Sequence, residues 1–335
     1  MPHPVVVEVT RGGRVESRHA GRLCVRDADG GTVLALGDVA APVFPRSAVK
    51  ALQALPLLES GAAERLALEP QEIALACASH AGEPEHVATA LAMLRKAGRE
   101  AGALECGAHW PSRDSAARAL ASGGGVPSAL HNNCSGKHAG FVCLACGTGH
   151  DPDGYIGVGH FVQREARAAI EGMCGVALAD GSFGIDGCSI PTWPVPLEAL
   201  ALAFARFGTG RGLKVNRAAA ARKIRDSVAA HPFMVAGTGR FDTEVMTVLG
   251  VRAFTKGGAE GVFCASLPEL GLGIAVKIED GGARASEALM MAAIARFLPL
   301  SDCEREGLEE WIEPRLVNWN GIEVGRLRVA GLPAG

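Results

Sequence analysis

Hydrophobic and polar positions alternate in short runs near the start of the chain. Between Pro4 and Asp38 the segments VVVEVT, RVESRH, RLCVRD and TVLALGD show the two-residue period of β-strands. RGGR and DADGG lie between such runs, and glycine readily adopts the positive φ that tight hairpin turns require. This zone therefore predicts an antiparallel meander.

The pattern becomes helical from Pro45 to about Ala230, where Ala-rich stretches such as VATALAMLRKAGREAG are punctuated by Gly and Pro. Strand signals return from Gly250 in GVRAFTK, GVFCASL and GLGIAVKI, and the amphipathic helix RASEALMMAAIARFL follows. Because both chain ends supply antiparallel strands, we expect one sheet built from both ends, with the helical middle covering a face. The predicted fold is mixed α/β (α+β), a single domain over residues 1–335 with two lobes. We expect the sheet lobe at about residues 1–44 and 231–335, and the helical lobe at about 45–230.

Composition narrows the class of protein. Hydrophobic residues make up 48% and charged residues 21% of the chain, with a net charge of -3, which is typical of a globular protein and not of a disordered or nucleic-acid-binding one. The first residues, MPHPVVVEVTRGG, lack the basic and apolar regions of a signal peptide, and no run of about 18 apolar residues offers a membrane span. We therefore expect a cytoplasmic protein with no nucleic-acid or membrane partner. The 10 cysteines are scattered, which favours buried thiols, metal ligands or reactive thiols over a disulfide framework.

The first chemical motif is FPRSAVKALQAL, in which Pro45 can open a helix because its missing N–H needs no partner there. Ser47 and Lys50 are three residues apart, which brings their side chains to within about 60° of each other on one helix face. A serine becomes nucleophilic when a base takes its proton, and a lysine serves as that base when burial or a neighbouring cation lowers its pKa. S-x-x-K alone is also compatible with a solvated helix start.

Two later stretches add to this motif. Ser79 and His80 lie in ACASHAGEPEH, and Lys256 lies in FTKGGAEG. An S-x-x-K, a central serine and a late Lys-Gly follow the order of the serine β-lactamase and penicillin-binding architecture. However, His80 follows Ser79 where an Asn is expected, and KGG replaces K-T-G. These departures argue against β-lactam chemistry.

The stretch HNNCSGKHAGF, residues 131–141, carries more reactive groups than a structural turn requires. We predict a helix that begins near Cys134 and ends at Gly147. With Cys134 at 0°, Lys137 falls at about 300° and His138 at about 40°, so the three side chains converge at the helix start. Unpaired N–H groups and a positive dipole at this end favour a thiolate and attract a carboxylate.

A second cysteine pair lies further along the predicted helix. Cys143 and Cys146 fall at about 180° and 120°, on another face from Cys134, so we expect buried thiols there and not half of a zinc site. Zinc at Cys134 would need further protein donors. The Gly- and Pro-framed loop GIDGCSIPTWP offers Asp186 and Cys188, although spacing alone does not link it to Cys134.

HNNCSGKHAGF, DGCSIPTWP, PRSAVK and CASHAGE together resemble the rhizobial-type, or class 3, L-asparaginases, the family also labelled asparaginase II. The match spans nearly the whole chain, and the stretches occur in the family's order. The resemblance implies a homodimer with a serine β-lactamase-like fold that hydrolyses L-asparagine to L-aspartate and ammonia (EC 3.5.1.1). It also implies a zinc ion held by Cys134, Lys137 and Cys188. The implied Ser–Lys pairs are Ser47 with Lys50 and Ser79 with Lys256. We expect four further residues at the substrate or beside the metal: Arg46, His80, His138 and Asp186.

The mechanism that follows is acyl transfer through a serine ester. Lys50 or a coupled lysine removes the Ser47 proton, Ser47 attacks the side-chain amide, ammonia leaves, and water frees aspartate. Whether Ser47 or Ser79 is the nucleophile stays open. We expect zinc to orient the substrate, because a serine already provides the nucleophile.

Two other classes of function remain as alternatives. A zinc-dependent amidohydrolase or deaminase would use metal-bound water directly, but the H-x-E and P-C-x-x-C pair of the zinc deaminases is missing. A non-catalytic binding protein would hold an amino acid without releasing ammonia. An ammonia-release assay with L-asparagine, beside L-glutamine and penicillin, separates these classes.

Overall fold

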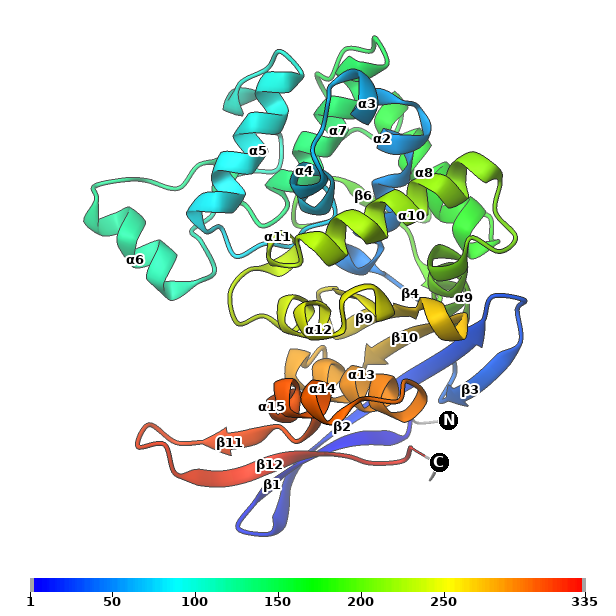
Figure 1. Ribbon diagram of the computed structural model, residues 1–335, viewed down its shortest axis with the longest axis vertical. Helices are drawn as coiled ribbons and strands as arrows, with labels where there is room; N and C mark the ends of the chain where they lie inside the picture. Colours follow the sequence, from blue (N-terminus) through cyan, green and yellow to red (C-terminus); the bar gives the residue numbers. More distant parts are fainter. Residues whose placement is uncertain (1–2, 333–335) are drawn as a thin grey trace. The chain divides into compact units, whose positions relative to one another are not determined.

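A computed structural model describes residues 3–332 of the chain. The chain divides into two compact units (Figure 1). Unit 1 consists of the described residues up to Ala48, of Pro194–Gly212, and of the described residues from Val248 onward, whereas unit 2 consists of Val49–Trp193 and Leu213–Thr247. The segment Pro194–Gly212 thus groups with the sheet, although the sequence pattern placed it in the helical lobe.

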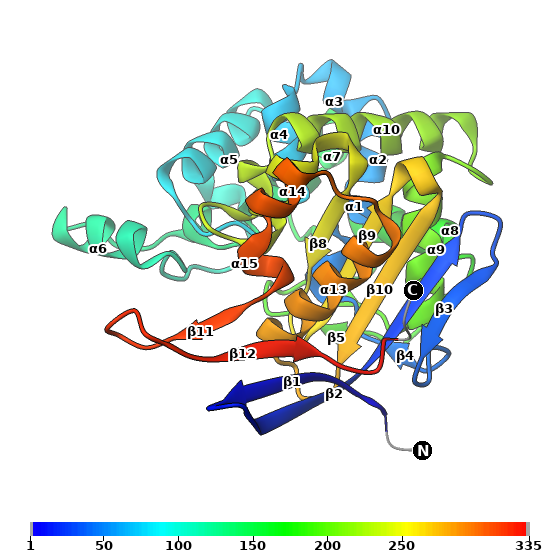
Figure 2. The same ribbon diagram turned by 60° about the horizontal axis from the view of Figure 1, so that its bottom comes forward.

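Unit 1 is built on one antiparallel sheet, as expected from the two strand-rich chain ends. The strands follow the order β11-β12-β1-β2-β10-β9-β8, and β3 pairs with β2 (Figure 2). Their bounds are β1 Val5–Arg11, β2 Arg14–Asp27, β3 Thr32–Leu36, β8 Phe254–Gly257, β9 Val262–Leu267, β10 Leu272–Ile278, β11 Arg315–Val317 and β12 Glu323–Val329. A separate short pair joins β4 (Pro42–Val43) to β7 (Val195–Pro196). The mixed α/β fold is therefore confirmed, and β11 and β12 are strands that the sequence pattern did not reveal.

The second strand corrects one prediction. RVESRH and RLCVRD were expected as separate strands, but both belong to the 14-residue β2. Its first half pairs with β1 and its second half, from Gly21, pairs with β10. A Cβ on Gly21 would lie 2.8 Å from the Lys277 carbonyl oxygen and 2.9 Å from a Val6 methyl group. This glycine therefore permits close packing where β2 changes partner, and it does not make a turn.

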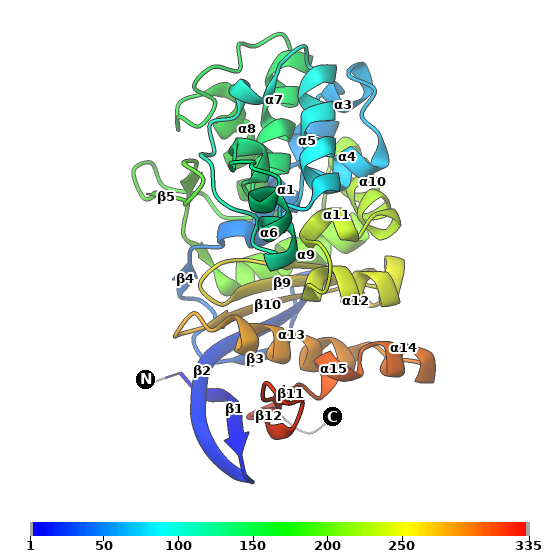
Figure 3. The same ribbon diagram turned by 90° about the vertical axis from the view of Figure 1, so that its left-hand side faces the viewer.

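Helices cover both faces of this sheet. α9 (Leu197–Thr209) and α13 (Ala283–Phe297) lie on opposite sides of β9 and β10 (Figure 3), and every residue of β9 is buried. α9 approaches β10 so closely that a Cβ on Gly273 would lie 2.0 Å from the Ala201 carbonyl oxygen and 2.3 Å from the Ala205 nitrogen. The other helices of unit 1 are the short η4 (Gly250–Arg252), η5 (Pro268–Leu270), α14 (Asp302–Gly307) and α15 (Glu309–Ile312).

Unit 2 is mainly helical. Its helices are α1 Lys50–Gln53, α2 Leu55–Glu59, α3 Ala62–Arg65, α4 Pro70–Leu75, α5 Pro84–Lys96, η2 Ala101–Ala103, α6 Asp114–Ser122, η3 Ala129–His131, α7 Ser135–Gly147, α8 Phe161–Cys174, α10 Val215–Ala230 and α11 Phe233–Ala236. Two further helices, η1 (Arg46–Val49) and α12 (Phe241–Leu249), run across the unit boundary. The short strands β5 (Gly184–Ile185) and β6 (Pro191–Thr192) form a hairpin in this unit. Within residues 3–332 no helix is long and apolar enough to cross a membrane.

α7 confirms the helix predicted from Cys134 to Gly147, with Cys134 as its N-cap residue. Residues 135–145 of this helix are all buried. A Cβ on Gly136 would lie 2.3 Å from the carbonyl oxygen of Leu75, the last residue of α4. The glycine in the middle of HNNCSGKHAGF therefore lets the start of α7 pack directly against the end of α4, which fixes the site described next.

The close approach of α9 and β10 gives a test of unit 1. Gly273→Ala should lower the free energy of unfolding by about 1–3 kcal/mol, because the added methyl group overlaps helix backbone that cannot move without losing its packing. Chemical denaturation followed by circular dichroism measures this change. Gly102→Ala is the control, since a Cβ there meets no atom within 4 Å. Equal stability of the two variants would contradict the packing described for β10.

Candidate active site

Lys50 is the centre of a buried polar cluster in unit 2. It is the first residue of α1 and is 1% exposed. Its Nζ donates to the Ala78 carbonyl oxygen at 2.5 Å, to Ser79 Oγ at 2.9 Å and to Cys134 Sγ at 3.1 Å. An ammonium group has three N–H donors, and these contacts match that number. The side chain therefore joins the segment after α4 to the N-terminal end of α7.

Backbone hydrogen bonds hold Ser79 and His80 in an extended stretch. The Ser79 amide donates to the Val235 carbonyl oxygen at 2.8 Å, and the His80 amide donates to the Asn133 carbonyl oxygen at 3.1 Å. Ser79 is half-buried, whereas Lys50 and Cys134 are buried. The serine that sequence reasoning paired with Lys256 is thus in hydrogen-bonding contact with Lys50.

Asn132 fixes the position of Cys134. The Cys134 amide donates to Asn132 Oδ1 at 2.8 Å, while Asn132 Nδ2 donates to the carbonyl oxygens of Cys106 and Gly107 at 2.9 and 3.0 Å. The asparagine is 5% exposed, and its amide group is satisfied inside the protein. Sequence reasoning missed this role, although Asn132 lies within the quoted motif and asparagine is a frequent residue before helices.

Cys134, Lys137 and Cys188 lie together, as the resemblance implied. Lys137 Nζ donates to Cys188 Sγ at 2.9 Å, and all three residues are at most 5% exposed. A hydrogen bond from Cys188, together with Lys50 and Lys137, holds the pKa of the Cys134 thiol well below its usual value despite burial. The same hydrogen bond and burial raise the pKa of Cys188. The two shifts favour ionisation of Cys134 over that of Cys188.

The loop of the β5–β6 hairpin presents Cys188 to α7. The Asp186 amide donates to the Ile190 carbonyl oxygen at 2.8 Å, and Asp186 Oδ1 accepts from the Gly187 amide at 2.7 Å. Ser189 has a φ of 75°, a left-handed conformation that is uncommon for a residue with a side chain. Burial lowers the pKa of Lys137, but Cys134, Cys188 and the Asp186 carboxylate outweigh it and the net pKa is raised. Asp186 thus contributes negative charge near the lysine.

His138 follows Lys137 on α7 and is fully buried. Its Nδ1 lies 2.6 Å from the hydroxyl of Tyr155, the one tyrosine of the sequence, and its Nε2 has no hydrogen-bond partner in the protein. Burial, with the nearby cations Lys137 and Lys50, holds the pKa of His138 well below its usual value, so the ring is neutral. The sequence analysis gave His138 no partner, and it did not identify Tyr155.

His80 has a different environment from the one expected of a substrate ligand. Its Nδ1 accepts from the Gly82 amide at 3.1 Å, so its Nε2 carries the proton and donates to Ser135 Oγ at 2.8 Å. Burial, then His86 and Lys50, keep its pKa well below the usual value. Both ring nitrogens are engaged within the protein, and a role for His80 at the substrate stays a prediction.

The Cys143 and Cys146 pair lies apart from this cluster. Cys143 is fully buried on α7, its Sγ donates to the Met93 carbonyl oxygen at 3.3 Å, and burial raises its pKa. No cysteine between residues 3 and 332 is joined in a disulfide. No group of three or more His, Cys, Asp or Glu side chains suited to a metal ion occurs between residues 3 and 332.

The remaining predicted site residues, Arg46, Ser47 and Lys256, belong to unit 1. Ser47 lies on η1, preceded by Arg46 with a φ of 50°. Lys256 on β8 is fully buried, and its Nζ donates to the Gly257 carbonyl oxygen at 2.7 Å. A Cβ on Gly258 would lie 2.8 Å from the Pro45 carbonyl oxygen, so the end of β8 packs against the segment that carries Ser47. Each of the pairs Ser47–Lys50 and Ser79–Lys256 takes one residue from each unit, and both pairs stay predictions.

Comparison with known proteins identifies the family. The family model for L-asparaginase II matches residues 7–329, nearly the whole chain. No curated protein matches the sequence. Among solved structures, the chain is similar to one titled "Crystal Structure Analysis of Mglu", with 15% sequence identity, coverage of 84% of this chain and 69% of that chain, and a TM-score of 0.37. That identity has no bearing on function, so the assignment rests on the family model. The chain belongs to the L-asparaginase II family and is a hydrolase of the L-asparaginase class.

Proposed function

We propose that this enzyme hydrolyses L-asparagine by serine acyl transfer with Lys50 as the general base, working as a cytoplasmic homodimer as the family resemblance implies. The observation that supports this mechanism is the 2.9 Å contact between Lys50 Nζ and Ser79 Oγ. That distance lies within the range in which a general base takes a proton from a hydroxyl group. Lys50 is 1% exposed, so bulk water has little access to its amine.

The reaction proceeds in two half-reactions. The ammonium of Lys50 first gives up one proton, because only the neutral amine can act as a base. The amine then takes the hydroxyl proton, and the serine oxygen attacks the side-chain amide carbon of asparagine to form a tetrahedral intermediate. The C–N bond then breaks, and Lys50 returns the proton to the departing nitrogen, which leaves as ammonia. A water molecule attacks the ester carbon, loses its proton to Lys50, and releases aspartate while the serine hydroxyl is restored.

Two serines are candidates for the ester. Ser79 is supported by its contact with Lys50 inside unit 2. Ser47 is supported by the S-x-x-K spacing and by the family resemblance. The positive φ of Arg46, directly before Ser47, is a backbone strain of the kind that clusters at functional sites. Locating the acyl group by mass spectrometry separates the two serines.

We also propose that Cys134, Lys137 and Cys188 hold one zinc ion. Zinc in proteins is bound by thiolates and nitrogen donors, and these three buried side chains supply two sulfurs and one amine that already contact one another. When bound, zinc would supply a Lewis-acid centre that orients the substrate and polarises it.

The charges of these three side chains would allow them to bind a doubly charged ion, because two of them can release protons. Cys134 carries a thiolate, whereas Cys188 Sγ and Lys137 Nζ are protonated, since the pKa of each is raised. Binding requires the deprotonated donors, so Cys188 and Lys137 would each give up a proton. A doubly charged ion would thus replace two protons, and the net charge of this buried cluster would stay unchanged.

Substitution of the base and the serines tests the mechanism. Lys50→Ala and Ser79→Ala should each lower kcat by about 100-fold or more, the usual cost of losing a general base or its partner. Ser47→Ala is measured beside them, and its loss of activity, together with an acyl group trapped on Ser47 of the wild-type enzyme, would assign the attack to that serine. Ammonia release from L-asparagine, with Glu85→Ala as an exposed control on α5, provides the assay. More than about a tenth of the activity remaining in Lys50→Ala would contradict the base assignment.

The substrate range gives a second test. L-Glutamine should be a poor substrate, because one extra methylene displaces the amide from a fixed serine by about a bond length, and such misplacement costs about 100-fold. Ratios of kcat/KM for the two amides measure the discrimination. Similar values for both would contradict a pocket fitted to asparagine. Release of no ammonia from either amide would favour a non-catalytic binding protein.

Metal analysis tests the zinc proposal. The purified enzyme should contain about one zinc per chain, which both Cys134→Ser and Cys188→Ser should lose, because each removes one thiolate donor. Cys143→Ser is the matched control on the same helix and should keep the metal. Because protons compete for the ligands, zinc affinity should fall as the pH falls. Zinc that follows Cys143 and Cys146 instead would place the metal on the other face of α7.

A further inference from the structure

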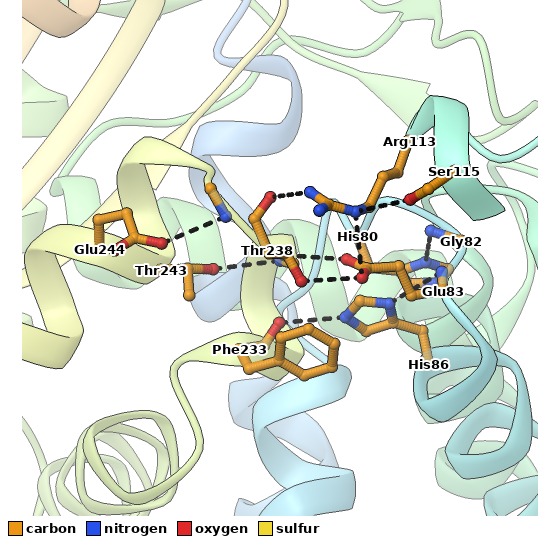
Figure 4. A network of polar contacts seen from close by, with 12 residues as sticks. His80, Gly82, Glu83, His86, Arg113, Ser115, Phe233, Thr238, Thr243 and Glu244 are labelled. Carbon is orange, nitrogen blue, oxygen red and sulfur yellow. Dashed lines mark hydrogen bonds and ion pairs between the residues drawn. The ribbon is translucent and has the colours of Figure 1, made fainter.

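A buried carboxylate outside the cluster around Lys50 organises the chain behind Ser79. Glu83 is the N-cap residue of α5 and is 9% exposed (Figure 4). Its Oε1 accepts from the Thr238 amide at 2.9 Å and its Oε2 accepts from Thr238 Oγ1 at 2.8 Å. Arg113 Nε lies 3.6 Å from Oε2, and Arg113 Nη1 donates to the Thr238 carbonyl oxygen at 2.9 Å. Thr238 is therefore held at its amide, its hydroxyl and its carbonyl group.

The residue before Thr238 is in a conformation that only glycine adopts readily. Gly237 has φ 106° and ψ -177°. A Cβ on this residue would lie 2.5 Å from Glu83 Oε1, 3.0 Å from the Ala81 side chain and 3.2 Å from a carbon of the His86 ring. The Gly237 amide donates to Thr243 Oγ1 at 3.1 Å. The carboxylate thus packs directly against the glycine backbone as well as binding Thr238.

Glu83 also fixes the other end of the same stretch, which we call the 233–240 segment (Phe233–Arg240). The Glu83 amide donates to His86 Nδ1 at 3.2 Å, which leaves the proton of His86 on Nε2. That nitrogen donates to the Phe233 carbonyl oxygen at 3.0 Å, and the His86 ring stacks on the Phe233 ring at 4.5 Å (Figure 4). The 233–240 segment is therefore held at Phe233 through His86 and at Thr238 directly.

Between these two anchors the segment contacts Ser79. The Val235 carbonyl oxygen accepts a hydrogen bond from the Ser79 amide at 2.8 Å, and the hydroxyl oxygen of the same serine accepts one from Lys50 Nζ. Movement of the 233–240 segment would therefore move the Ser79 backbone and change the distance from Oγ to Nζ. An error of about 1 Å in such a distance costs about 100-fold in rate.

We propose that Glu83 is a positioning residue for acyl transfer, whose carboxylate keeps Ser79 in contact with Lys50 by holding the 233–240 segment at Thr238. This inference rests on the proposed function, because it assumes that the contact between Ser79 and Lys50 serves the reaction. Glu83 acts through hydrogen bonds to protein groups and not through contact with the substrate. Its role therefore depends on its acceptor atoms and not on its ability to exchange a proton.

That distinction can be measured with two substitutions at one position. Glu83→Ala removes both acceptors, so kcat should fall about 10-fold or more while KM changes less than about 3-fold. Glu83→Gln keeps a carbonyl acceptor for the Thr238 amide and offers an amide donor to Thr238 Oγ1, so it should retain most of the activity. Glu85→Ala and Glu85→Gln are matched controls, because Glu85 is an exposed carboxylate in the same turn of α5. Equal loss in Glu83→Gln and Glu83→Ala would overturn the positioning role and indicate proton transfer or a charge requirement.

A second site keeps the inference testable if Glu83→Ala unfolds. Gly237→Ala should lower kcat with little change in KM, because the new methyl group overlaps Glu83 Oε1 and displaces the segment from the opposite side. Circular dichroism and zinc content should match the wild-type enzyme in the variants compared. Wild-type kcat in a folded Gly237→Ala or Glu83→Ala enzyme would overturn the positioning role. Lys50→Ala, measured in the same assay, separates the two proposals. If it is inactive, wild-type kcat in the Glu83 or Gly237 variant overturns only the positioning role and not acyl transfer. If Lys50→Ala is active, acyl transfer with Lys50 as the base is itself contradicted.

Discussion

A buried ammonium group must find its hydrogen-bond acceptors inside the protein, because transfer of an unpaired charge from water is very costly. Lys50 meets this requirement with a carbonyl oxygen, a hydroxyl group and a sulfur atom that come from two parts of unit 2. The same contacts bring Ser79 and Cys134 to one nitrogen. The arrangement of the site in unit 2 thus follows from the solvation of a single cation.

The surrounding structure keeps these acceptors in place. Gly136 allows α7 to touch the end of α4, Asn132 holds the Cys134 amide, and Val235 accepts the Ser79 amide. None of these residues offers a nucleophile or an ionisable group. Their effect is geometric, since reaction rates depend steeply on the distance between the reacting groups. HNNCSGKHAGF therefore contains two kinds of residue, those with reactive groups and those that position them.

The sequence predicted local features well and long-range contacts poorly. α7 was located correctly because its apolar composition and the Gly147 end are both local signals, and the strands β8, β9 and β10 follow short apolar runs separated by glycines. β2 was divided in error near Gly21, whose close packing against β10 is a tertiary effect that the alternating pattern does not show. The contact between Lys50 and Ser79 joins residues 29 positions apart, and no periodicity specifies such a pair. The cluster of Cys134, Lys137 and Cys188 was expected only from the family resemblance, because a loop distant in sequence supplies Cys188.

The charge states of the lysines and histidines around the site differ, and burial is a main cause of the difference. His80, His86 and His138 all have lowered pKa values, so these rings remain neutral while Lys137 stays charged beside the thiolate of Cys134. A neutral imidazole has one donor and one acceptor, and in His80 and His86 the acceptor is fixed by a backbone amide. Protonation of His80 would lose that bond and add a second buried cation near Lys50, which the lowered pKa of His80 reflects. The histidines therefore fix geometry at neutral pH, and the positive charge that balances the thiolate comes from the lysines.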